Sequence, residues 1–246
     1  MLLARYTGDQ VFQSPSGTPA YRKQMFPIRD TEPSYSKPVV TVVLIVINIL
    51  VFLFEFSLDS YSQNALIFQY GLVPDRFHWS NVLTSMFLHG GWMHVLGNMW
   101  FLWIFGDNIE DAFGHAKYLL FYLLCGVAAA LTQVFFNRYS RVPMVGASGA
   151  IAGVMGAYLV KFPQSRIRSL IFILFFLTTV DVPAWIMLIY WFGIQFVSGF
   201  ESLGSAQVAQ GGTAFFAHVG GFLVGILLIY LLGTQQTYRR RKDIYW

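Results

Sequence analysis

The sequence predicts an all-α membrane protein, a bundle of six transmembrane helices with its N and C termini in the cytoplasm. Of its 246 residues, 56% are hydrophobic and only 11% are charged, whereas a soluble domain has roughly 25% charged residues. Several apolar runs have the length of about 17–25 residues that a helix needs to cross hydrocarbon. The chain opens without the pattern of a removable signal peptide, so we expect none.

Three regions are expected along the chain. Residues 1–38 are polar and rich in Pro, Ser and Gly, a composition typical of a flexible cytoplasmic arm. Residues 39–233 form the six-helix membrane domain, and residues 234–246 form a basic cytoplasmic tail. Cys125 is the single cysteine, which excludes a disulfide within the chain.

The first four spans follow the longest apolar runs, at residues 39–58, 91–105, 118–136 and 148–162. A long loop, 59–88, separates the first two spans, and its aromatic residues suit the membrane interface. After the second span in the sequence, Glu110 and Asp111 are expected to cap helix ends and to form hydrogen bonds with a cytoplasmic loop.

Residues 170–200 are long for one helix and short for two helices with a loop. We expect an interfacial or re-entrant element at 170–180 and the fifth span at 183–200, with Pro183 at its start. The sixth span is expected at 214–232, and the glycine-containing segment 203–212 before it is expected to be a mobile cap.

The basic residues give the orientation. Of the 16 Lys and Arg residues, only Arg76, Arg138 and Arg141 fall on the side of the membrane opposite the termini. The positive-inside rule therefore places both termini in the cytoplasm. Topology accounts for the net charge of +4, and nucleic-acid binding is not expected. With one crossing between them, the fourth and sixth spans both run from outside to inside, so the first residues of both are expected near the same outer leaflet.

A serine opens the fourth span. Ser148 lies between Gly146 and Gly149, and the free backbone N–H groups of a helix start can face a developing oxyanion. A serine nucleophile with a histidine base is the minimal equipment for acyl transfer. The alternative is a small-residue packing face along this helix, which the glycines favour in either case.

A histidine near the start of the sixth span is the candidate base. His218 shares a helix face with Gly221 and Gly225, so another helix can approach the imidazole closely. A buried histidine that merely satisfies its hydrogen bonds is the alternative. Since no carboxylate is placed to orient His218, we expect a dyad rather than a triad.

The second span adds His94 and Asn98, which share a face at i and i+4. They can donate hydrogen bonds to an oxyanion, or they can form a structural network, the role we expect for His89. A metal site is not expected, because no His-Glu-x-x-His pattern is present and no acidic residue shares this face.

Together these residues resemble the rhomboid family of intramembrane serine proteases. The resemblance covers about residues 25–232 and rests on HGGWMHVLGN at 89–98, GASGAI at 146–151 and AHVGG at 217–221. It implies that Ser148 is the nucleophile, His218 the general base, and His94 and Asn98 the oxyanion donors, joined by the Ser148 backbone N–H. It also implies cleavage of transmembrane protein substrates within the lipid bilayer, without metal or any other cofactor.

This sequence departs from the family pattern at two places. Ser80 and Asn81 follow Trp79, where rhomboids often carry a Trp-Arg pair in the first outer loop. Ala152 stands where some members have a tyrosine that stacks on the base, so support for the His218 ring must come from elsewhere.

Two other function classes compete with proteolysis. One is a non-catalytic rhomboid-like protein that binds membrane clients, and the other is a small transporter. A transporter is expected to show repeated halves or polar groups through both leaflets, whereas the polar groups here cluster in the outer half. We expect a multi-pass protein of a bacterial cytoplasmic membrane.

Overall fold

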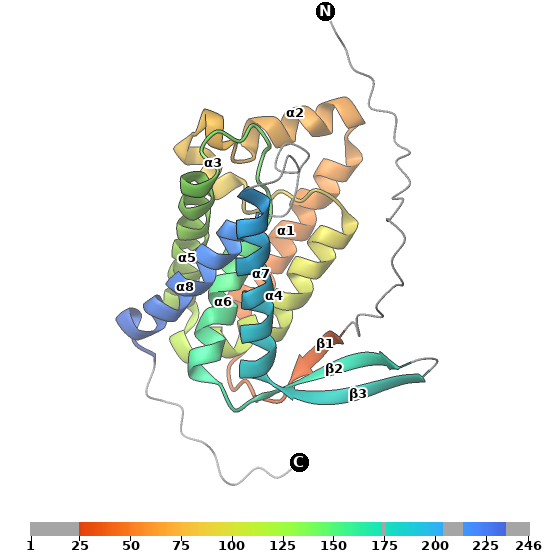
Figure 1. The fold of residues 1–246 in the computed structure, drawn as a ribbon, viewed down its shortest axis with the longest axis vertical. Helices are drawn as coiled ribbons and strands as arrows, with labels where there is room; N and C mark the ends of the chain where they lie inside the picture. The colour runs from red at the N-terminus through yellow and green to blue at the C-terminus, as the bar shows by residue number, and fades with distance from the viewer. Residues whose placement is uncertain (1–24, 174–175, 204–213, 235–246) are drawn as a thin grey trace, which may run out of the picture.

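The described part of the chain is a bundle of long helices with a small sheet at one end (Figure 1). A computed structural model describes residues 25–173, 176–203 and 214–234. The long helices are α1 (Val39–Ser57), α4 (Trp92–Phe113), α5 (His115–Phe136), α6 (Ser148–Lys161), α7 (Ala184–Leu203) and α8 (Phe215–Leu232). They correspond in order to the six expected spans, and this mostly helical fold confirms the predicted fold class. The expected cap at 203–212 lies almost entirely outside the described residues.

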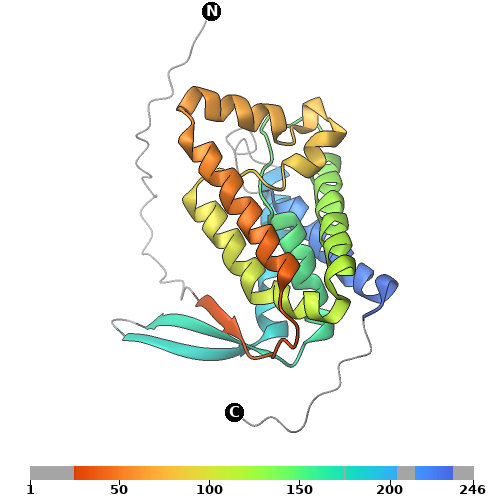
Figure 2. The same ribbon diagram turned by 180° about the vertical axis from the view of Figure 1, so that it is seen from behind.

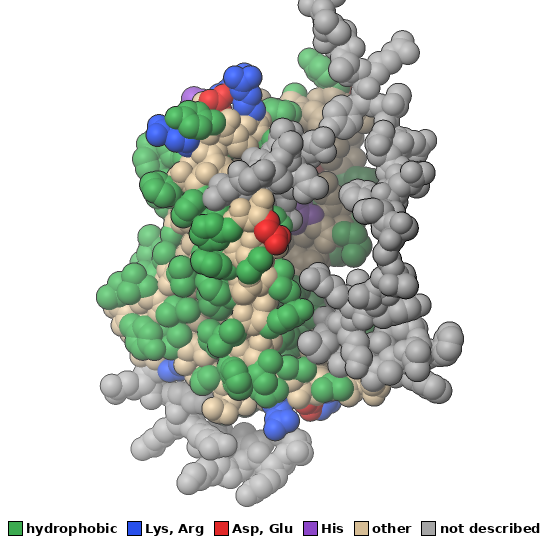
Figure 3. All heavy atoms as spheres, viewed as in Figure 1, with side chains coloured by type: hydrophobic (Ala, Val, Ile, Leu, Met, Phe, Trp, Pro, Cys, Tyr) green, Lys and Arg blue, Asp and Glu red, His purple; other side chains and the backbone are tan. Residues whose placement is uncertain are grey.

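The outer surface of the bundle is apolar. Four described helices, α1, α5, α7 and α8, are long and apolar enough to cross a membrane. Helix α6 is apolar but has only 14 residues, of which ten, Gly149 to Tyr158, are buried. On the face shown in Figure 3, Lys and Arg side chains lie towards the two ends, with hydrophobic side chains between them. The count of six crossings and the orientation of the termini remain predictions.

The segment 59–88, expected as a long loop, contains three short helices: α2 (Ser60–Tyr70), η1 (Pro74–Arg76) and α3 (Trp79–Thr84). Helix α2 begins where the Asp59 carboxylate accepts hydrogen bonds from the backbone N–H groups of Tyr61 and Ser62. These helices cover the end of the bundle away from the sheet (Figures 1 and 2).

At the opposite end, the start of α1 is capped by a side chain from α4. The Glu110 carboxylate accepts hydrogen bonds of 2.8 Å from the backbone N–H groups of Val40 and Thr41, and Asp111 accepts from the N–H groups of Tyr35 and Ser36. These bonds satisfy donors that a helix start leaves free. The expected capping role of Glu110 and Asp111 is confirmed.

The sheet was not predicted. Strands β1 (Met25–Asp30), β2 (Arg166–Ile173) and β3 (Phe176–Pro183) pair antiparallel in the order β1-β2-β3. Residues 170–180, expected as an interfacial or re-entrant element, are therefore part of a hairpin. A cross-strand pair supports its register: the Arg168 guanidinium donates to both carboxylate oxygens of Asp181, at 2.8 and 3.0 Å.

The N-terminal arm differs from expectation in the same way. Residues 25–30, expected to be irregular, form the edge strand β1, while residues 1–24 and 235–246 lie outside the described residues. The division of the chain into arm, membrane domain and tail stays a prediction.

Helices α6 and α8 touch through their backbones. A Cβ atom added to Gly221 would overlap the carbonyl of Gly149, and one added to Gly225 would overlap the carbonyl of Gly153. The contacts advance by four residues along both helices in the same sense, so the two helices run parallel. The expected small-residue face of α6 is confirmed, and it faces α8.

This close approach predicts the effect of one added methyl group. We expect Gly225→Ala to destabilise the protein by about 1–3 kcal/mol, because neither backbone can move without disturbing the buried helix α6. Gly193→Ala, on α7 where an added Cβ meets nothing within 4 Å, is the matched control. Thermal unfolding in detergent should show a lower Tm for Gly225→Ala alone; equal Tm values for both variants would contradict the packing described here.

The sheet is fastened to α6 by a half-buried carboxyl group. The Tyr158 hydroxyl donates a hydrogen bond of 2.6 Å to Asp30 at the end of β1. Burial raises the pKa of Asp30 from 3.8 to about 6, although the hydrogen bond from Tyr158 acts in the opposite direction. Folding thus favours the protonated form of Asp30.

The sign of this shift predicts a pH dependence. The stabilising contribution of Asp30 is fully present below about pH 4 and is lost as the pH rises through about 6. Asp30→Asn keeps an acceptor for Tyr158 but cannot ionise, so we expect it to raise stability at pH 7.5 by on the order of 1–2 kcal/mol. The gain in Tm should vanish near pH 4. Asp59→Asn is the control, because hydrogen bonds at the start of α2 lower the pKa of Asp59, so this substitution should not raise the Tm at pH 7.5. A gain in Tm for Asp30→Asn at every pH would contradict the account.

Candidate active site

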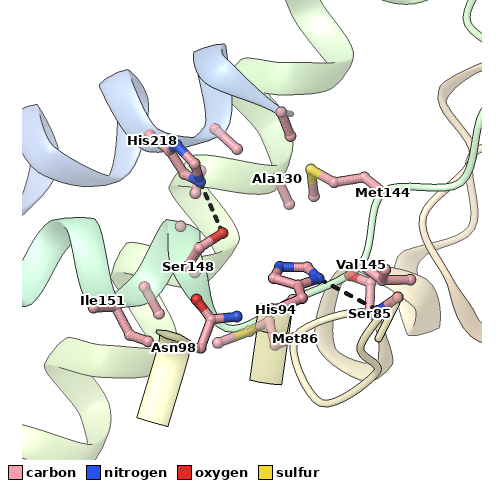
Figure 4. A pocket seen from close by; sticks show the side chains of 18 of the residues that line it. Ser85, Met86, His94, Asn98, Ala130, Met144, Val145, Ser148, Ile151 and His218 are labelled. Atoms are coloured by element: carbon pink, nitrogen blue, oxygen red, sulfur yellow. Dashed lines mark hydrogen bonds between the residues drawn. The ribbon is translucent and has the colours of Figure 1, made fainter. Parts of the chain in front are cut away.

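The first residue of α6 and a residue in the first turn of α8 meet at the α6–α8 contact. The Oγ atom of Ser148 lies 2.8 Å from Nε2 of His218, as the dashed line in Figure 4 shows. The His218 side chain is buried, at 7% exposure. Because α6 and α8 run parallel, both residues lie near the same end of the bundle, as expected for two spans that run in the same direction.

The other side of the imidazole contacts α7. The Nδ1 atom of His218 lies 2.7 Å from Oε1 of Gln195, and the Trp191 ring lies 5.7 Å from the imidazole between centroids, tilted by 35°. The support for the ring that Ala152 cannot give therefore comes from the fifth long helix. Sequence analysis missed both residues.

One signal could have found Gln195. It is an amide in the middle of a mostly apolar span, and polar side chains in such spans usually mark function. Trp191 precedes it by four residues and so shares its helix face, but tryptophans are frequent in this chain and carry no such signal by themselves.

His94 and Asn98, one turn apart on α4, face Ser148 across the cavity (Figure 4). The backbone of Gly146, two residues before Ser148, has φ = +120°, a conformation that favours glycine. A Cβ atom at Gly146 would lie 2.7 Å from Nε2 of His94 and 3.4 Å from Nδ2 of Asn98. A side chain at position 146 would thus fill the space in front of both nitrogen atoms.

The hydrogen bonds around these two side chains leave donors available. The backbone N–H of Gly90 donates to Nδ1 of His94 at 3.3 Å, so a neutral His94 carries its proton on Nε2, the atom nearest Gly146. The Nδ2 atom of Asn98 is buried and has no partner among the described residues. A buried donor without a partner is costly unless something binds to it.

His89 does not join this group of donors. Its backbone N–H donates to the buried carboxylate of Glu55 on α1, at 3.2 Å, and its ring packs edge-on against His94 with 5.1 Å between centroids. His89 therefore ties the start of α4 to α1, which agrees with the structural role expected for it.

The side chains of the site, apart from those of His89 and Glu55, line a cavity of about 500 Å³. The polar side chains among its lining residues are those of Ser85, His94, Asn98, Ser148, Gln195 and His218. Apolar side chains complete the wall, among them those of Met86, Phe101, Ala130, Met144, Val145 and Ile151. Such a cavity can hold an extended apolar peptide segment with one carbonyl near Ser148, and it has room for water.

Comparison with known proteins places these residues in a family. Residues 76–235 match the family model for the rhomboid domain. The chain is 29% identical over 203 residues to the rhomboid protease GluP of Bacillus subtilis, covering 80% of this chain and 35% of that protein. It is 26% identical over 168 residues to the mitochondrial rhomboid protein 1 of Saccharomyces cerevisiae, covering 67% of this chain and 45% of that protein.

A third similar protein is the mitochondrial RHOMBOID-like protein 6 of Arabidopsis thaliana, 31% identical over 157 residues, which are 63% of this chain and 44% of that protein. The chain therefore spans between a third and a half of the length of these curated relatives. The rhomboid match covers well over half of this chain and includes α4 to α8, which carry Ser148, His218 and both α4 donors. The chain belongs to the rhomboid family.

Proposed function

We propose that this multi-pass membrane protein is a serine endopeptidase that cleaves transmembrane segments of other membrane proteins. What carries the proposal is the 2.8 Å hydrogen bond between Ser148 and His218, because it joins a hydroxyl to a base inside a cavity. Membership of the rhomboid family supports it independently.

The proposed reaction is acyl transfer in two steps. Nε2 of His218 accepts the proton of Ser148 as Oγ attacks a substrate carbonyl carbon. The imidazolium then gives this proton to the leaving amine, and the C–N bond breaks to leave an acyl ester on Ser148. Water, deprotonated by His218, hydrolyses the ester and restores the hydroxyl.

The tetrahedral intermediates carry a negative oxygen that needs donors. The Nε2–H of His94, the Nδ2–H of Asn98 and the backbone N–H of Ser148 are the proposed donors. They are fixed by α4 and by the start of α6 before any substrate arrives, so little reorganisation accompanies the reaction.

The substrate must expose a backbone carbonyl to this cavity. A transmembrane helix uses its carbonyls in its own hydrogen bonds, so we propose a preference for segments that Gly, Pro or polar residues allow to open. Six crossings with cytoplasmic termini would put the cavity near the outer surface. The bacterial cytoplasmic membrane stays a prediction, because the similar proteins include mitochondrial ones.

The first test compares cleavage of a single-span model substrate by the reconstituted wild-type protein, Ser148→Ala and His218→Ala. Each substitution should lower kcat by about 10³-fold or more, because the two side chains act as a unit. Cleavage at the wild-type rate by either variant would exclude the dyad. Binding of the substrate by the wild-type protein without cleavage would instead favour a client-binding protein.

The second test concerns the oxyanion donors. Asn98→Ala should lower kcat by about 10²–10³-fold while KM stays nearly unchanged, since the amide acts only on the charged intermediate. Asn48→Ala on α1 is the matched control, because the Asn48 amide donates to Leu44 of its own helix and lies outside the cavity. If Asn98→Ala raised KM and left kcat intact, Asn98 would be a substrate-binding residue.

A further inference from the structure

We propose that Gln195 is a positioning residue that sets the tautomer of His218, an inference that rests on the proposed serine protease function. Gln195 lies on α7, whereas Ser148 and His218 lie on α6 and α8. Its Oε1 atom is 2.7 Å from Nδ1 of His218. Helix α7 thus supplies a group that orients the base, which is the role of the third member of a triad and is missing from a Ser-His dyad.

The argument depends on where neutral His218 carries its single proton. The base must present a lone pair at Nε2, and so its proton must be on Nδ1. Ser148 cannot impose this arrangement, because a hydroxyl both donates and accepts hydrogen bonds. An amide oxygen facing Nδ1 can impose it, because Oε1 only accepts.

The same contact serves the charged state. When His218 takes the proton of Ser148, the imidazolium still carries a proton on Nδ1, and Oε1 of Gln195 accepts it in an unchanged geometry. A hydrogen bond to a charged donor is stronger than one between neutral groups. Gln195 therefore stabilises the imidazolium that forms with the tetrahedral intermediate, without itself carrying charge.

A merely structural role would be to hold α7 against α8. Aromatic contacts already do this: Phe192 stacks on Phe222 with 4.7 Å between centroids, and Phe200 packs edge-on against Phe216. Leucine at position 195 would extend the apolar face of α7 at less cost than an amide. Gln195 is half-buried and lines the cavity beside the proposed base, where positioning of that base accounts for an amide.

The experiment uses the full chain in detergent or liposomes and two substitutions of one residue. Gln195→Leu removes the acceptor and keeps a similar volume, and Gln195→Glu keeps the acceptor. We expect Gln195→Leu to lower kcat by about 10- to 100-fold at unchanged KM. We expect Gln195→Glu to keep kcat within about threefold of the wild type at the pH where each is most active.

Gln133→Leu is the matched control. Oε1 of Gln133, on α5, accepts from the backbone N–H of Ala217 at 3.2 Å, so this variant also loses a glutamine contact to α8 but leaves the imidazole untouched. A second readout is the ¹⁵N spectrum of labelled histidine, with His218 assigned from the signals that His218→Ala lacks. The Nδ1–H tautomer should dominate in the wild type and in Gln133→Leu, and should lose its dominance in Gln195→Leu.

The outcomes separate this inference from the function on which it rests. An active Ser148→Ala variant would overturn the proposed function itself. If Ser148→Ala is inactive, wild-type kcat in Gln195→Leu would overturn the role of Gln195. Equal losses in Gln195→Leu and Gln195→Glu, with the same tautomer in both, would also overturn it, because the acceptor would then not be what matters.

Discussion

The backbone contact between α6 and α8 is the constraint on which the site depends. Glycines at 149, 153, 221 and 225 let the helices approach until the carbonyl of one occupies the place of a side chain on the other. Their parallel course then brings the first residue of α6 to the first turn of α8. The 2.8 Å bond between Ser148 and His218 is a consequence of that approach, since neither side chain is long enough to bridge two helices packed through larger residues.

Around this contact, each polar side chain comes from a helix that is fixed by other means. Helix α4 carries His94 and Asn98 and is tied to α1 at both ends, by Glu110 at one end and by Glu55 and His89 at the other. Helix α7 carries Gln195 and docks on α8 through aromatic rings. Hydrogen bonds inside an apolar bundle are strong, and unpartnered polar groups are costly. The Nδ2 donor of Asn98 is buried and has no partner among the described residues, so a bound acceptor would remove this cost.

Much of the fold could be predicted from the sequence, because hydropathy and local patterns report which segments cross the apolar region. The limits of α4 were less predictable. Its apolar run ends near Phe105, but the helix continues to Phe113 and ends at Gly114, with φ = +76°. Hydropathy marks where a helix leaves the apolar layer, and a helix can continue beyond that point. The hairpin was missed because the two residues between its strands in the sequence, 174 and 175, are Leu and Phe, and the sequence there lacks the Gly, Asn or Asp typical of tight turns.

The site residues likewise include some that the sequence indicated and one that it did not. Ser148, His218, His94 and Asn98 stand in local patterns of glycine or at helical spacing, so the sequence alone indicated them, and their catalytic roles remain a proposal. Gln195 is linked to His218 only by the packing of α7 on α8, which no local pattern reports.

The most direct measurement is mass spectrometry of the protein after reaction with a fluorophosphonate, which traps an activated serine as a stable covalent adduct. The account predicts one adduct on the peptide that contains Ser148, formed by the wild-type protein and strongly reduced in His218→Ala. An adduct on another residue, or equal labelling of Ser148 with and without His218, would contradict the claim that the α6–α8 contact activates this serine.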